Sequence, residues 1–477
     1  MHQASVSIFP SITPAATAAI ITGAYPAENG IVGAAWFDKS ANQVAYYGDD
    51  MWVAAREGFG TFLRDFLVRL NGDRLRVPTL FERVEASGRR AACFNYLVYR
   101  GQEEHRVDIP WLLSVLPGAP LTEVVKGPST LYLGDFVTDG RERPKIRVPY
   151  GPLHRFGMDD AATAAFLCEA AAAGALPEFT VAYFADNDYR SHEVGPHAAL
   201  PVLDKIDTAL GEVFEAAGGL DRFLSTTAVI VTSDHGHCEI GDDEDTAVIR
   251  LSDVFSEFPQ ATLGEPWREG DDILICPNMR AAQIYLRDAA RLACVVRAAR
   301  AEPRIDQVIW RGRGHGETRA YHVETPRGAL TFRRGNGRGM AVRDAHGNAW
   351  TLEGECAALG LAASGGCAES MDYPNALERI AGALDADDSG EVWVTAKPGC
   401  EFAAPGGKPH VGGGSHGALH ALDSLSPVIA TGPVRLPRAM RSVDLAPICL
   451  DLMGIDAGNL FRQDMPRFAR PRAPGNP

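Results

Sequence analysis

The chain has 477 residues, 46% of them hydrophobic and 22% charged, a composition typical of a globular protein with a sizeable core. Its formal net charge of −15 disfavours a large footprint on duplex nucleic acid, and no apolar run reaches the roughly 18 residues that a membrane span requires. Residues 1–10 show no basic segment followed by a long apolar one, so no signal peptide is predicted there. The nine scattered cysteines, none in a Cys-x-x-Cys pair, indicate a reduced, cytoplasmic chain.

The first predicted helix begins near Thr13. Thr13 is a favourable N-cap and Pro14 a favourable first helical residue, so we expect a helix to start here and to end near Gly23. A hydroxyl at that place faces backbone N–H groups and the positive end of the helix dipole, a setting that attracts phosphate and favours an alkoxide. The alternative is that Thr13 merely caps the helix.

Two Asp/His pairs follow predicted strands in the middle of the chain. The apolar run Thr180–Ala185 leads to Asp188 and His192, which can bind one divalent metal ion together or simply belong to a polar loop. The run Thr227–Thr232 leads to Asp234-His235 on a tight turn, where both side chains can point into a crevice. This dipeptide is common in proteins, so by itself it indicates little.

Strand-like and helical patterns alternate along the chain. A helix with apolar residues at helical spacing is predicted behind Pro201, and Val392–Thr395 and Pro427–Ala430 are further continuously apolar strands. This alternation predicts an α/β fold with a doubly wound, mostly parallel sheet and helices on both faces. In such sheets, polar residues just beyond the strand ends converge on one crevice.

The segment Ile305–Glu355 departs from this pattern, because its short β-type runs are separated by Gly-rich turns. We expect a small inserted antiparallel β-rich subdomain there. The chain is therefore divided into a first part of a catalytic core (1–245), an inserted segment (246–385), a last part of the core (386–460) and a loose tail rich in Pro and Arg (461–477).

A single histidine, His416, lies on the glycine-rich loop Gly412–Gly417, whose alternative interpretation is a flexible linker. Together with Thr13 and the two Asp/His pairs, His416 would complete a site of oxygen and nitrogen ligands that suit zinc. Such a site can hold two metal ions about 4 Å apart, which clamp the attacking and leaving oxygens of an in-line displacement.

These motifs, in this order, resemble those of the nucleotide pyrophosphatase/phosphodiesterase family of the alkaline phosphatase superfamily. The resemblance covers roughly Phe9–Asp245 and Glu391–Ile455, whereas residues 246–390 match no motif of the family. The matching stretches are Phe9–Thr13, Thr22–Pro26, Asn29–Gly33, Asp188–His192 with Gly195-Pro196, Thr232–Gly236, Ser415–Gly417, Ser442–Pro447 and Leu452–Ile455.

The resemblance implies a metal-dependent phosphodiesterase or nucleotide pyrophosphatase that acts on a small phosphorylated substrate. Thr13 would attack phosphorus to form a covalent phosphothreonine, which water then hydrolyses. Two divalent metal ions are implied, expected to be zinc. One would be held by Asp188, His192 and His416, and the other by Asp234, His235 and Thr13.

Other functions remain open at this stage. A phosphomonoesterase or a phosphonate hydrolase on the same fold is the related alternative, and a degenerate, non-catalytic binding protein is the alternative from another class. A sulfatase is disfavoured, because that sister family needs Cys or Ser at the position of Thr13 and an Arg two residues later, where this chain has Ala15. His410 and His420 lie outside the matching motif and are not expected to be metal ligands.

The chain departs from the family pattern in three places. Ala16 stands where the family usually has an Asn that contacts a phosphoryl oxygen. His237 stands where the family has the Met of Asp-His-Gly-Met, and we expect it behind the ligands or at the surface. The family also takes a metal carboxylate from an Asp that ends the first core strand, but only twelve residues precede Thr13 and none is acidic. We therefore expect that strand to lie upstream of Met1, unless Asp38 or His237 fills the vacancy.

Overall fold

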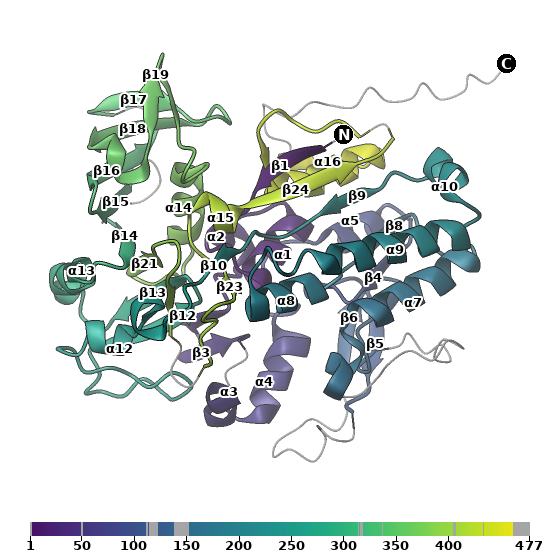
Figure 1. The fold of residues 1–477 in the computed structure, drawn as a ribbon, viewed down its shortest axis with the longest axis horizontal. Coiled ribbons are helices and arrows are strands. Elements are labelled where there is room, and N and C mark those ends of the chain that lie inside the picture. The colour runs from purple at the N-terminus through teal and green to yellow at the C-terminus, as the bar shows by residue number, and fades with distance from the viewer. Residues whose placement is uncertain are drawn as a thin grey trace.

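The computed structural model describes residues 2–48, 51–110, 113, 123–137, 152–312, 314, 318–335, 337–403, 407–432 and 434–460. Within these residues the protein is an α/β structure in which helices pack against several sheets (Figure 1). The tail predicted to be loose, residues 461–477, lies outside the described residues.

One part of the core is built on a three-stranded parallel sheet. Its strands, in spatial order, are β7 (Thr130–Tyr132), β4 (Ala91–Phe94) and β8 (Phe179–Ala182). On one face, side chains of β4 and β7 pack with α7 (Asp160–Ala172) and α9 (Pro201–Ala216), which lie side by side (Figure 1). On the other face β4 contacts α5 (Leu80–Ala86). Helices cover both faces, as expected for a continuously apolar strand such as β4.

A four-stranded sheet joins the two ends of the described chain. Its spatial order is β25 (Met440–Arg441), β1 (His2–Val6), β24 (Leu425–Ala430) and β9 (Ile230–Thr232), so that purple β1 lies beside yellow β24 in Figure 1. β1 is parallel to β25, but β24 is antiparallel to both of its neighbours. The prediction that Pro427–Ala430 joins a mostly parallel sheet is therefore wrong, because an apolar pattern reports burial and carries no information on strand direction.

The two faces of this four-stranded sheet have different surroundings. Val428 and Ala430 are buried in a cluster with residues of α16 (Leu445–Leu452). On the opposite face, Val231 and Ile429 are cross-strand partners and are 37% and 47% exposed. The described residues leave that face uncovered.

The largest sheet has ten described strands and lies at the other end of the molecule (Figure 1). In spatial order they are β12 (Ile273–Asn278), β13 (Ala281–Leu286), β21 (Val392–Ala396), β14 (Ile305–Arg311), β15 (Ala320–Thr325), β16 (Gly328–Arg334), β18 (Ala349–Gly354), β17 (Met340–Arg343), β20 (Cys367–Glu369) and β19 (Ala362–Ser364). The strands within Ile305–Glu355 pair antiparallel, as predicted. They continue a larger sheet and do not form a small one of their own.

Strand β21 explains why the sheet is larger than the small subdomain that was predicted. It pairs antiparallel with both β13 and β14, so the segment Val392–Thr395 does not belong to a parallel sheet as predicted. Trp393 faces the main core, whereas Val392 and Val394 face a second core that also contains residues of α13 (Leu292–Ala301). Val392–Thr395 is apolar because both faces of the strand are buried, and parallel and antiparallel sheets can both bury a strand in this way.

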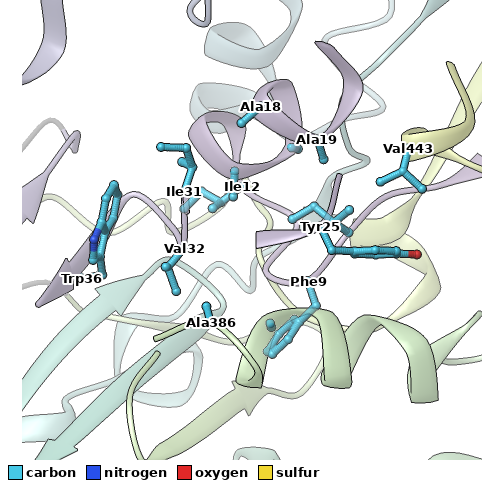
Figure 2. Packing of buried hydrophobic residues seen from close by; sticks show 14 of the residues in the cluster. Phe9, Ile12, Ala18, Ala19, Tyr25, Ile31, Val32, Trp36, Ala386 and Val443 are labelled. Carbon is cyan, nitrogen blue, oxygen red and sulfur yellow. The ribbon is translucent and has the colours of Figure 1, made fainter. Parts of the chain in front are cut away.

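Helix α1 (Thr13–Thr22) lies deep in the main core. Its alanines allow close packing, and Figure 2 shows Ala18 and Ala19 among apolar side chains from distant segments, such as Ile31 and Val443. The preceding loop is anchored by Phe9, whose ring centre lies 5.0 Å from that of Trp393. The core therefore fixes the start of α1 firmly in position.

Candidate active site

The predicted site residues meet at one end of the two smaller core sheets. Asp188 and His192 lie one turn apart on α8 (Asp186–Val194), which follows β8, and are therefore on the same helix face. Asp234-His235 follows β9 after one intervening residue, Ser233. His416 follows β23 (Gly414–Ser415), a short strand that pairs antiparallel with β10 (Cys238–Glu239).

Thr13 is the first residue of α1 and not its N-cap as predicted. Ile12 occupies the N-cap with extended backbone, and no side chain caps this helix. The reason lies in the tertiary structure. The Thr13 hydroxyl is 3.1 Å from Nε2 of His235, which lies just beyond the C-terminal end of β9. The hydroxyl is half-buried and is directed to the site.

The backbone fixes the tautomers of three imidazoles. Nδ1 of His192 lies 2.8 Å from the Gly414 carbonyl oxygen, and Nδ1 of His416 lies 2.8 Å from that of Ser11. Nδ1 of His235 similarly lies 3.1 Å from its neighbour's carbonyl oxygen. Because a carbonyl oxygen only accepts, Nδ1 carries the proton in each ring, which leaves the Nε2 lone pair free to bind a metal ion.

The spacing of the donor atoms fits a metal ion. Nε2 of His192 and Nε2 of His416 are 3.3 Å apart, the edge of a tetrahedron whose metal–nitrogen bonds are about 2.0 Å long. The two carboxylate oxygens of Asp188 lie 3.7 Å and 3.8 Å from these nitrogens. Donor atoms of Asp188, His192, His416 and His237 all lie within 4.8 Å of one another.

A second group of donors surrounds Thr13. Oδ2 of Asp234 is buried and accepts no hydrogen bond from the described residues, and it lies 3.4 Å from Nε2 of His235. The rings of His235 and His416 stack with centres 3.6 Å apart, so the two groups of donors adjoin. A buried carboxylate oxygen without a donor is costly unless a cation is bound beside it, so these residues fit a second metal ion.

Electrostatics prepare the site for cations. Burial lowers the pKa of His192 to about 4 and holds the pKa of His416 well below its usual value, so both rings are neutral near pH 7. Burial also acts to raise the pKa of Asp188, but the hydrogen bond from His237 and the nearby imidazoles outweigh it, and this pKa lies well below its usual value. Burial raises the pKa of Asp234. Neutral imidazoles beside an ionised carboxylate are the protonation states that a metal site requires.

The glycine-rich loop is tightly packed and does not behave as a linker. A Cβ atom on Gly413 would lie 2.0 Å from the carbonyl oxygen of His192, so only glycine permits this close approach. Nearby, the Arg280 side chain forms a fully buried ion pair with Asp423. The backbone N–H of Arg280 donates a hydrogen bond of 2.8 Å to the His416 carbonyl oxygen. These contacts hold His416 in place.

Two histidines outside the predicted ligand sets lie at this site. His237, expected behind the ligands or at the surface, belongs to the four-residue cluster. Asp38, the other residue considered for the vacant ligand position, instead accepts hydrogen bonds from the backbone N–H groups of Ser40 and Ala41 in its own turn. His410 has its ring centre 4.3 Å from that of His192 and its Nδ1 2.9 Å from a carboxylate oxygen of Glu401. No local signal distinguishes these histidines from others, because their positions depend on contacts between distant segments.

Comparison with known proteins places this site in context. The model of the type I phosphodiesterase/nucleotide pyrophosphatase family matches residues 2–419. Human ectonucleotide pyrophosphatase/phosphodiesterase 5 shares the fold, with a TM-score of 0.53 at 15% identity over 94% of this chain and 86% of that one. Phosphonoacetate hydrolase from Sinorhizobium meliloti, solved with phosphonoformate, gives 0.50 at 16% identity over 94% and 86%.

Matches to curated sequences are shorter. A 2,3-bisphosphoglycerate-independent phosphoglycerate mutase of Campylobacter jejuni is 36% identical over 81 residues, 17% of this chain and 15% of that protein. The corresponding mutase of Wolinella succinogenes is 27% identical over 167 residues, 33% of this chain and 31% of that protein. The chain thus matches no more than about a third of the length of these relatives.

Proposed function

Because the chain belongs to the type I phosphodiesterase/nucleotide pyrophosphatase family, we propose that it is a metal-dependent phosphohydrolase that acts through a covalent phosphothreonine on Thr13. One observation carries this proposal. The Thr13 hydroxyl, at the start of a buried helix, lies 3.1 Å from His235 Nε2 and beside a cluster of carboxylates and neutral imidazoles.

Two divalent metal ions, which we propose to be zinc, complete the site. The proposed ligands are Asp188, His192 and His416 for one ion, and Asp234, His235 and Thr13 for the other. Nitrogen and oxygen donors of this kind suit zinc. When bound, such ions lower the pKa of a hydroxyl group and neutralise charge that develops on phosphoryl oxygens.

Thr13 performs the covalent step. Its hydroxyl loses its proton, Oγ1 forms a bond to phosphorus, and the bond from phosphorus to the leaving oxygen breaks. The leaving group departs with its electron pair and takes up a proton. The positive end of the α1 dipole stabilises negative charge on Oγ1 and on the phosphoryl group. Water then attacks phosphorus, which releases the phosphoryl product and restores the Thr13 hydroxyl.

We propose a small phosphodiester or nucleotide pyrophosphate as the substrate. The murine ectonucleotide pyrophosphatase/phosphodiesterase 5, which shares this fold with a TM-score of 0.53, was solved with AMP. A phosphonate hydrolase is the second candidate, supported by the similarity to phosphonoacetate hydrolase in complex with phosphonoformate. Ala16 is fully buried and offers no amide to a phosphoryl oxygen, so substrate contacts must come from other residues.

The proposed setting is the cytoplasm. All nine cysteines lie in the described residues and are free thiols, which is the observation that supports this proposal.

No described helix has the length and apolar character that crossing a bilayer requires.

An activity screen tests the proposal. Protein loaded with zinc or manganese is assayed on phosphate monoesters, phosphodiesters, nucleotide pyrophosphates and phosphonates, beside a Thr13→Ala variant and metal-depleted protein. We expect turnover of at least one class, lost in the variant and on depletion. One metal ion or none per chain, without turnover of any class, would instead indicate a non-catalytic binding protein.

A further inference from the structure

We propose that His237 is a fourth protein ligand of the metal position formed by Asp188, His192 and His416. This position would then be closed, and substrate would approach only the position beside Thr13. The second part of this inference rests on the proposed function, whereas the first concerns metal binding alone.

The pairing of two short strands places His237 next to a proposed ligand. β10 and β23 are antiparallel with Cys238 opposite Ser415, so the next residues outward, His237 and His416, are also side by side. The centres of their rings are 4.8 Å apart. The side chain of His237 is only 7% exposed, so it lies within the site and not at the surface.

The contacts of His237 are directed to the same donor atoms. Its Nε2 lies 2.7 Å from Oδ1 of Asp188, the oxygen that is also 3.8 Å from Nε2 of His416. Its Nδ1 is buried and has no hydrogen-bond partner among the described residues. The polar interaction of this ring is therefore with the cluster itself. A metal ion bound by both residues would replace the proton that Nε2 and Oδ1 share.

The number of ligands decides what a metal position can do. Zinc held by four protein ligands is a closed, tetrahedral centre, whereas a catalytic centre has three protein ligands and one open position. Three imidazoles and the Asp188 carboxylate supply four ligands without water or substrate. Asp234, His235 and Thr13 supply only three on the other side, where the reacting hydroxyl is. The two positions would therefore divide the work, one ordering the site and the other contacting the phosphoryl group.

Cobalt binding tests this inference without turnover. Apo-protein is titrated with Co²⁺ while its visible d–d absorption is recorded, because that absorption is more intense for four-coordinate than for five- or six-coordinate Co²⁺. The variants are His237→Met, which removes the imidazole at similar bulk, and His237→Gln, whose amide still donates a hydrogen bond to Asp188 but is a poor ligand. His197→Met, at an exposed histidine, is the matched control.

The variants separate a ligand from a residue that merely orients Asp188. We expect the tighter Co²⁺ site to weaken at least about tenfold in both His237 variants, with loss of the intense absorption, and to stay unchanged in His197→Met. Wild-type affinity and absorption in His237→Gln would overturn the inference, even if His237→Met fails to fold. That result would leave the proposed function intact, since the proposed function is tested separately, by turnover in the substrate screen, in Thr13→Ala and in metal-depleted protein.

Discussion

Replacing Thr13 by alanine separates catalysis from stability. Among the described residues, Oγ1 makes one hydrogen-bond contact, to His235, and caps no helix N–H group, so its loss should cost about 1 kcal/mol of unfolding free energy. Loss of the attacking atom should lower turnover by about 10⁴-fold or more, which is about 5.4 kcal/mol of barrier at about 1.36 kcal/mol per tenfold. The effect on the barrier should therefore exceed the effect on stability several times over.

The assay compares kcat/KM on the best substrate of the screen with thermal unfolding of the same samples. Thr22→Ala is the matched control, because it removes a buried hydroxyl from the other end of the same helix, where Oγ1 donates to the Ala18 carbonyl oxygen over 2.6 Å. It should lower stability by about 1 kcal/mol and leave kcat/KM unchanged. Thr13→Ser keeps a hydroxyl and should retain measurable turnover. Turnover of Thr13→Ala within tenfold of wild type would refute the assignment of Thr13 as nucleophile.

Three further predictions concern the metal site. His416→Ala should lower the zinc content from two ions towards one per chain. His420→Ala should leave the zinc content unchanged, because the His420 ring packs edge-on against Tyr373 outside the cluster. Equal zinc content in the two variants would contradict the ligand assignment. Gly413→Ala should destabilise the protein and weaken zinc binding, because the added Cβ would lie 2.0 Å from the His192 carbonyl oxygen. Gly211→Ala on α9 is the control: its added Cβ would have nothing within 4 Å, so thermal unfolding should show the protein stabilised by about 0.5–1 kcal/mol. The zinc ion held by His192 should remain bound down to about pH 5 in equilibrium dialysis, because protons displace a metal only as a ligand protonates and burial lowers the pKa of His192 to about 4. Loss of this ion near pH 6.5, the range of an ordinary imidazole, would show that burial does not protect the site.

The sequence alone determined the local features of this protein. The helical spacing behind Pro201 predicted α9, and the polar residues after two apolar runs predicted which side chains follow β8 and β9. The order of the motifs predicted the family, which the match over residues 2–419 confirms. These features are readable because helix periodicity, turn residues and motif spacing are properties of neighbouring residues. The roles of the individual site residues stay predictions.

Only the tertiary structure decided how these segments combine. The apolar pattern of β21 reflects burial on both faces of the strand, and that of β24 reflects burial on one face. Strand direction and strand partners depend on which distant segments pair, and both strands are antiparallel to their neighbours. His237 reaches the cluster through the register of β10 on β23, which joins residues nearly 180 positions apart in the chain. Likewise, the Thr13 hydroxyl faces His235 instead of capping α1, because the core fixes where that helix starts. Hydrogen bonds and packing between distant segments set these positions, and no local pattern in the sequence encodes them.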